Sequence, residues 1–297
     1  MFKFFQNLGR SLMLPVAVLP AGAIITGIGN LLNALHILPT VAMFFSIVGT
    51  AILGQLGLIF AIGVAIGMAK KNDGAVALAG ALGYAMVTKV LNPENVATLF
   101  NIKEKAVNLG FTKMDNSNVF LGIIIGLIAA YSFNKFSEVE LPMALSFFSG
   151  KRLVPIMTVF FSTILAVILL FIWPMVFSGI VAFGEWLVGF GSFGAFLYGV
   201  FNRLLIPTGL HHALNAVFWF DTAGINDIGK FQTGVDAVKG ITGRYQAGFF
   251  PIMMFGIPAA ALAMYHSAET KQQKQVWGWF LASAISAFVV GVTEPIE

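Results

Sequence analysis

Long apolar runs alternate along the chain with short polar connections. Each run has about 20 residues, which is the length that an α-helix needs to cross a bilayer. The runs lie at about 12–35, 41–68, 75–91, 119–133, 153–183, 185–202, 246–265 and 276–292. The pattern therefore predicts an all-α fold, a polytopic membrane bundle of roughly eight helical spans.

Composition supports this prediction and excludes several kinds of chemistry. The hydrophobic fraction is 58% and the mean hydropathy is +0.88, more than a soluble domain needs to fill its core, so lipid must cover much of the surface. The chain contains no cysteine, which excludes a disulfide framework, a thiolate metal site and a cysteine nucleophile. No P-loop, metal-ligand cluster or dinucleotide fingerprint stands out, so we expect neither metal nor cofactor.

Charge places the connections on two sides of the membrane. The net charge of +4 indicates topology bias rather than affinity for nucleic acid. Connections that share one side carry the basic residues Lys3, Arg10, Lys70, Lys71, Lys135, Lys151 and Arg152, whereas 35–40 and 178–184 have no Lys or Arg. The positive-inside rule therefore predicts a cytoplasmic N-terminus. Counting the spans places the connection 92–118 on the non-cytoplasmic side despite its three lysines. Its length and mixed charges predict a folded or interfacial excursion.

The alternation of connections between the two sides of the membrane breaks down again after Asn202. If Lys271 and Lys274 are cytoplasmic, the span 246–265 starts outside, and 203–220 has to cross the membrane wholly or partly. A helix facing lipid would not tolerate the Arg, Pro and paired His of that stretch. A broken or re-entrant backbone that faces a polar cavity would tolerate these residues, because water or substrate can satisfy the freed backbone groups.

Four separated motifs occur in a fixed order along the chain: GKRLVP at 150–155, RLLIPTGLHHALNAVFWF at 203–220, FFPIMMFG at 249–256 and GVTEPIE at 291–297. Together they resemble the glucose superfamily of phosphoenolpyruvate-dependent phosphotransferase system (PTS) sugar permeases, the IIC components. The continuation of the second motif most resembles N-acetylglucosamine permeases, with glucose and maltose members close behind. The resemblance covers nearly the whole chain.

The resemblance implies a multi-pass protein of the bacterial inner membrane, a helical bundle with re-entrant hairpins that forms a homodimer. By this likeness, 1–183 is the dimer-interface half and 184–297 is the sugar-binding half. The family pattern continues beyond 297, so the resemblance also implies that the chain is C-terminally incomplete, ending at the start of the second hairpin.

The resemblance further implies a part in a sugar phosphotransferase complex. The phosphoryl donor is a phosphocysteine on a IIB domain, which this cysteine-free chain does not carry. In the family, the histidine and glutamate at the positions of His211 and Glu294 lie close to the sugar hydroxyl that becomes phosphorylated. Either side chain could act as a base or orient that hydroxyl, because phosphoryl transfer depends mainly on alignment and charge stabilisation.

The residue types themselves suit a neutral polyhydroxylated ligand. Carboxylate, imidazole, amide and guanidinium groups supply fixed donors and acceptors, and an aromatic ring can stack on a sugar's apolar face. The predicted sugar-binding residues are Arg203, His211, His212, Asn215, Trp219, Thr293 and Glu294. Five of them have a structural alternative: a water-exposed helix-end carboxylate for Glu294, a hydrogen-bonding histidine for His211, a snorkelling anchor for Arg203, and helix-contact or interfacial roles for Asn215 and Trp219.

Other readings of the same residues stay open. Lys151 and Arg152 are more readily explained as anchors of a cytoplasmic loop, although they could also receive the anionic phosphorylated partner domain. His211 and Glu294 could form the proton relay of a secondary sugar transporter. A sugar-sensing membrane module that signals to a partner is a third possibility. The polar residue types do not select one sugar, because related hexoses present almost the same hydroxyls.

Overall fold

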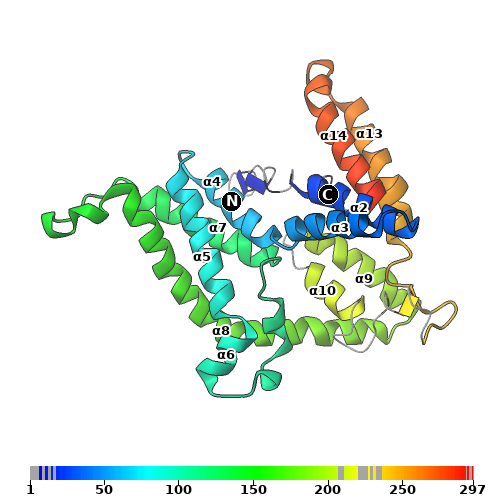
Figure 1. The fold of residues 1–297 in the computed structure, drawn as a ribbon, viewed down its shortest axis with the longest axis horizontal. Helices are drawn as coiled ribbons and strands as arrows, with labels where there is room; N and C mark the ends of the chain where they lie inside the picture. The colour runs from blue at the N-terminus through cyan, green and yellow to red at the C-terminus, as the bar shows by residue number, and fades with distance from the viewer. Residues whose placement is uncertain are drawn as a thin grey trace. The chain divides into compact units, whose positions relative to one another are not determined.

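The computed structural model describes residues 7–8, 11–12, 15, 18–206, 211–219, 227, 230–231, 236–291, 293 and 296. These residues form helices and connections without a strand, which confirms the all-α prediction (Figure 1). Internal contacts divide the chain into two compact units. The first unit comprises Met1–Val16 and Gly54–Ser178, and the second comprises Ala17–Leu53 and Gly179–Glu297. The roles assigned to 1–183 and 184–297 stay a prediction.

The first unit is built on three mutually packed helices, α4, α5 and α7. A side chain at position 126 would place its Cβ atom 2.7 Å from Cβ of Val64 and 2.8 Å from the carbonyl oxygen of Ala61. Gly126 therefore allows α4 and α7 to pack closely. The elements of this unit are α4 (Leu56–Met68), α5 (Gly74–Val90), α6 (Pro93–Phe100), η1 (Glu104–Ala106), η2 (Leu109–Lys113), α7 (Val119–Phe136), η3 (Met143–Phe148), η4 (Gly150–Arg152) and most of α8 (Leu153–Val188).

The excursion at 92–118 is folded rather than extended. Asn92 and Asn118 cap the N-termini of α6 and α7, where their side chains accept backbone N–H groups at 2.8 and 2.9 Å. The buried Tyr84 hydroxyl hydrogen-bonds to the carbonyl oxygens of Asp115 and Asn118, at 2.9 and 3.1 Å. Local capping and contacts to the neighbouring helices thus give this segment the folded structure that its sequence predicts.

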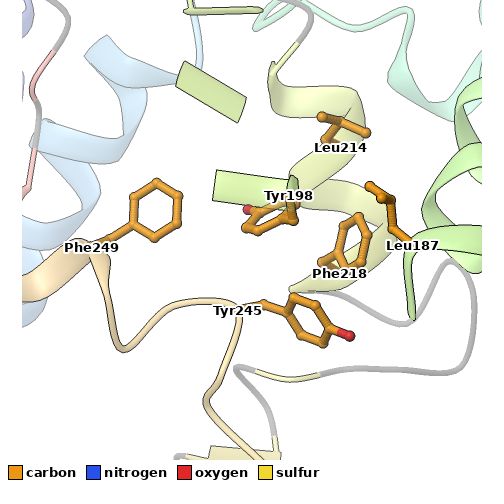
Figure 2. Close-up of a cluster of buried hydrophobic side chains, with 6 residues drawn as sticks. All are labelled: Leu187, Tyr198, Leu214, Phe218, Tyr245 and Phe249. Atoms are coloured by element: carbon orange, nitrogen blue, oxygen red, sulfur yellow. The ribbon is translucent and has the colours of Figure 1, made fainter. Parts of the chain in front are cut away.

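The second unit contains two helix pairs and the elements around a buried aromatic cluster. Helix α2 packs on α3, α13 packs on α14, and α2 contacts α14. The cluster consists of Leu187, Tyr198, Leu214, Phe218, Tyr245 and Phe249 (Figure 2). The elements are α2 (Leu19–Ala34), α3 (Pro39–Leu53), the end of α8, α9 (Ser192–Leu205), α10 (His211–Phe218), α12 (Phe249–Pro251), the π-helix η7 (Ile252–Gly256), α13 (Ile257–Ser267) and α14 (Thr270–Val290).

Helix boundaries differ from the apolar runs at two places. The run 41–68 forms two helices, because α3 ends at Leu53 and α4 begins at Leu56. Helix α8 continues through Gly184 and Glu185, since one glycine and one carboxylate do not end an otherwise favourable helix. In the described part of the chain, three helices are long and apolar enough to span a membrane, or five if each of two bent pairs is one span.

Candidate functional site

Helix α9 brings two polar side chains to one buried face. Tyr198 and Asn202 are four residues apart, which places them one turn apart on the helix surface. Both are buried, and both point their polar groups at Asn215 on α10. The Oδ1 atom of Asn215 accepts hydrogen bonds from the Tyr198 hydroxyl at 2.8 Å and from Nδ2 of Asn202 at 2.6 Å. These bonds fix α10 against α9 and leave a polar surface at their junction.

A cavity of about 250 Å³ lies beside this junction, within the second unit. Its wall combines amide, imidazole, guanidinium and hydroxyl groups with aromatic and aliphatic side chains. The lining residues are Asn202, Arg203, Ile206, His211, Asn215, Trp219, Phe249, Met253, Gly291 and Thr293. Such a mixture of fixed polar groups and apolar surface is typical of small-molecule sites.

Arg203 joins two stretches that are far apart in sequence. Its Nη1 atom donates to the Thr293 hydroxyl oxygen at 3.1 Å, across ninety positions of the chain. The guanidinium carbon also lies 4.7 Å from the centre of the Phe249 ring, a cation–π contact. The cationic side chain is therefore held in one orientation at the cavity wall, with Phe249 on one side and Thr293 at its end.

Five of the predicted sugar-binding residues line this cavity: Arg203, His211, Asn215, Trp219 and Thr293. His211 is only 6% exposed, and the indole N–H of Trp219 donates to the carbonyl oxygen of Tyr245 at 3.2 Å. Glu294 lies outside the described residues, as does the side chain of His212. Their predicted roles stay predictions.

Sequence reasoning missed three contributors to this region: Asn202, Tyr198 and Phe249. The spacing of Tyr198 and Asn202 was a usable signal, because polar groups four apart in an apolar helix share one face. Phe249 carried no such signal, because an aromatic residue in an apolar run is equally compatible with lipid contact.

Lys151 and Arg152 belong to the first unit and take part in local contacts. The ammonium group of Lys151 lies 2.5 Å from the carboxylate of Asp73, and this bond, with the N–H of Ala75, lowers the pKa of Asp73. Arg152 donates to the carbonyl oxygen of Phe147 at 3.0 Å and lies 4.8 Å from the centre of its ring. Both basic residues remain exposed. These contacts suit loop anchors, and partner docking stays a prediction.

The described cavity can hold a hydroxyl-rich ligand by hydrogen bonding. Its lining offers donors from Arg203 and both kinds of group from the two asparagines, His211 and Thr293. Trp219 supplies an aromatic surface. Within the described residues, no group of three His, Cys, Asp or Glu side chains could hold a metal ion.

Comparison with known proteins gives a match along nearly the entire chain. The family model "Phosphotransferase system, EIIC" matches residues 9–297. The chain is 44% identical over 297 residues to the "PTS system N-acetylglucosamine-specific EIICB component" of Bacillus subtilis, covering 100% of this chain and 61% of the relative. It is 44% identical over 308 residues to the EIICBA component of the same specificity from Escherichia coli, covering 99% and 43%.

A third relative is the "PTS system N-acetylglucosamine-specific EIIC component" of Streptomyces coelicolor. Identity is 42% over 312 residues, covering 100% of this chain and 73% of the relative. The chain thus spans about three fifths of the Bacillus subtilis relative and less than half of the Escherichia coli relative.

Proposed function

The chain belongs to the phosphotransferase system EIIC family, and from this premise we propose that it is the membrane permease part of a system that takes up and phosphorylates N-acetylglucosamine. Three relatives at 42–44% identity carry this specificity in their names. We propose the bacterial inner membrane as its location, with a cytoplasmic N-terminus, and a homodimer as its assembly.

The observation that carries the proposal is the cavity at the junction of α9 and α10. At about 250 Å³ it is slightly smaller than the usual ligand pocket, which is about 300–1,000 Å³, and it therefore suits a small ligand such as a single sugar ring. Asn215 and Arg203 are already held by neighbouring groups, so a ligand would meet donors and acceptors in fixed directions. Trp219 would face the apolar side of the ring.

The proposed reaction is a phosphoryl transfer to one sugar hydroxyl. The hydroxyl oxygen bonds to phosphorus while the bond from phosphorus to the cysteine sulfur of a B component breaks, and the thiolate leaves. The hydroxyl proton passes to His211 or Glu294, or, if these side chains only orient the hydroxyl, to the departing thiolate. Two relatives include a B component in their names, EIICB and EIICBA, which supports a B component as the partner.

Docking of the B component is proposed at the exposed basic pair Lys151 and Arg152. A phosphorylated partner is anionic, and these two side chains carry positive charge on an exposed surface of the first unit. Because both also have local contacts, we expect them to affect the rate of encounter more than the stability of the complex.

Uptake into membrane vesicles tests the proposal against its alternatives. With the full-length protein, uptake of N-acetylglucosamine should require a phosphoryl donor and deliver sugar phosphate. Uptake that needs an ion gradient and delivers unmodified sugar would instead identify a secondary transporter. Sugar binding without any uptake would identify a sensor.

Three substitutions in the full-length protein test the assigned residues. Glu294→Gln should abolish phosphorylation and weaken sugar binding while the protein still inserts in the membrane, and near-normal turnover would remove Glu294 from the site. His211→Ala should lower activity more than His212→Ala, because His211 lines the cavity. The reverse ranking would show that His212, rather than His211, is the more important histidine of the site.

A further inference from the structure

Asp227 is a buried carboxylate that does not line the cavity of the proposed sugar site. It is 4% exposed and belongs to the second unit. A charged side chain in such a position is costly unless strong hydrogen bonds compensate it. The partners of Asp227 therefore indicate why the second unit retains a carboxylate there.

The carboxylate of Asp227 binds two backbone N–H groups of one turn. Its Oδ1 atom accepts the N–H of Gly243 at 2.7 Å, and its Oδ2 atom accepts the N–H of Tyr245 at 3.1 Å. Gly243 has φ of 89°, a conformation that residues with a Cβ atom rarely adopt. The side-chain amide of Gln246 also donates to the carbonyl oxygen of Asp227, at 3.4 Å. The hydrogen bonds of this one residue thus fix both the shape of the turn and its position.

The turn connects to the cavity through Tyr245. The carbonyl oxygen of Tyr245 accepts the indole N–H of Trp219, and Trp219 lines the cavity. The ring of Tyr245 lies 4.7 Å from that of Phe218 and 5.7 Å from that of Tyr198, measured between centroids (Figure 2). The Tyr198 hydroxyl in turn donates to Asn215. Two routes therefore lead from the Asp227 carboxylate to cavity side chains.

We infer that Asp227 is a positioning residue for the sugar site: by fixing the turn at 243–245, it sets the orientation of Trp219 and Asn215. The inference rests on the proposed function, because it assumes that the cavity binds the sugar. Asp227 itself makes no contact with the ligand and takes no part in proton transfer.

Substitution of Asp227 in the full-length protein tests the inference. Asp227→Asn keeps the size of the side chain but exchanges one acceptor for an NH₂ group, which would face a backbone N–H. We expect the dissociation constant for N-acetylglucosamine to rise on the order of 10-fold. In phosphorylation assays, KM should rise similarly while kcat per folded molecule changes less than about twofold.

Asp236→Asn is the matched control. Asp236 precedes the same turn, is exposed, and has φ of 54°, which asparagine tolerates well. This substitution makes the same change of charge as Asp227→Asn. The Asp236→Asn protein should bind the sugar as tightly as the wild type does. Equal affinities for both variants, or a loss of kcat without a change in KM in Asp227→Asn, would overturn the inference.

Hydrogen exchange in the wild-type protein provides a test that needs no variant. The backbone amides of Gly243 and Tyr245 should exchange slowly even without sugar, because both donate to a buried carboxylate. Exchange as fast as that of the exposed residues at 236–240 would contradict the inference. If the wild type binds no sugar, the proposed function fails; if wild type and Asp227→Asn bind it equally tightly, only the role of Asp227 fails.

Discussion

Buried polar side chains have different partners in the two units. In the first unit the described ones are serines and threonines, and the hydroxyls of Thr88 and Thr158 bond to carbonyl groups of their own helices. In the second unit they include asparagine, histidine, aspartate and glutamine, and those of Asn215 and Asp227 bond to groups elsewhere in the chain.

This difference indicates that the first unit is held together by packing, whereas the second unit also orients polar groups for ligand binding. Helices of the first unit are held by close contact at small residues, and the hydroxyls of Thr88 and Thr158 bond within their own helices. The Tyr84 hydroxyl is the exception described above, because it bonds to the segment at 92–118. The second unit depends on polar bonds between segments, which cost more to bury but fix donors and acceptors around a cavity. A membrane-type sequence with few charges therefore concentrates its polar interior in the unit that contains the proposed site.

The largest expected effect comes from breaking the first unit alone. A leucine at position 126 would overlap Val64 and the backbone of Ala61, and overpacking of this kind costs about 1–3 kcal/mol or more. Gly126→Leu should greatly lower the yield of folded protein, measured by detergent size-exclusion chromatography, without changing sugar affinity per folded molecule. Gly74→Ala is the control, because a Cβ atom there meets nothing within 4 Å. A normal yield for Gly126→Leu would show that α4 and α7 are not so closely packed.

Removal of a buried amide from the second unit should lower the stability of the protein more than removal of a buried hydroxyl from the first. Asn215→Leu removes the acceptor of the Tyr198 hydroxyl, at about 1–3 kcal/mol for a stranded group, and leaves the Asn202 amide with only its longer bond of 3.4 Å to the Tyr198 oxygen. We expect loss of sugar binding and a clearly lower melting temperature. Thr158→Val removes a hydroxyl that bonds only within its helix, and should cost less than about 1 kcal/mol. Similar melting temperatures for the two variants would refute the comparison.

Two arginines with matching aromatic contacts give a finer test. Arg203→Lys keeps the charge but loses the planar group that lies over Phe249 and donates to Thr293. Sugar affinity should fall several-fold, equivalent to about 1 kcal/mol. Arg152→Lys makes the same change beside Phe147 in the first unit and should leave sugar binding unaltered. Calorimetric titration without the B component measures both, and equal losses would argue against a specific role for Arg203.

The smallest effect concerns the ion pair of the first unit. Pairing with Lys151 lowers the pKa of Asp73 below its ordinary value of 3.8, so the pair stabilises the protein fully above that value and less as the pH falls through the lowered pKa. The wild type should therefore melt slightly higher than Asp73→Asn at about pH 7, and this advantage should shrink toward about pH 3. Asparagine still caps α5, which isolates the ion pair. An advantage that is unchanged by acid would contradict the assignment.

Much of the helical fold follows from the apolar pattern, whereas two boundaries and one network do not. Hydrophobic periodicity cannot place the break between α3 and α4, because Gly54 and Gln55 differ little from tolerated positions such as Gly184 and Glu185. The network of Tyr198, Asn202 and Asn215 escaped detection because its bonds join residues 13 and 17 positions apart. Arg203 and His211 were conspicuous, since charge and imidazole are rare in apolar runs.

The hydrogen bond from Arg203 to Thr293 also has a consequence for the order of assembly. It closes a loop of ninety positions, and contacts that close long loops lose much chain entropy before they gain any energy. The complete cavity should therefore be among the late features of a nascent chain, after the local helices have formed. Ligand affinity then reports that this unit has finished folding, and a sugar that binds only the finished form would favour its completion.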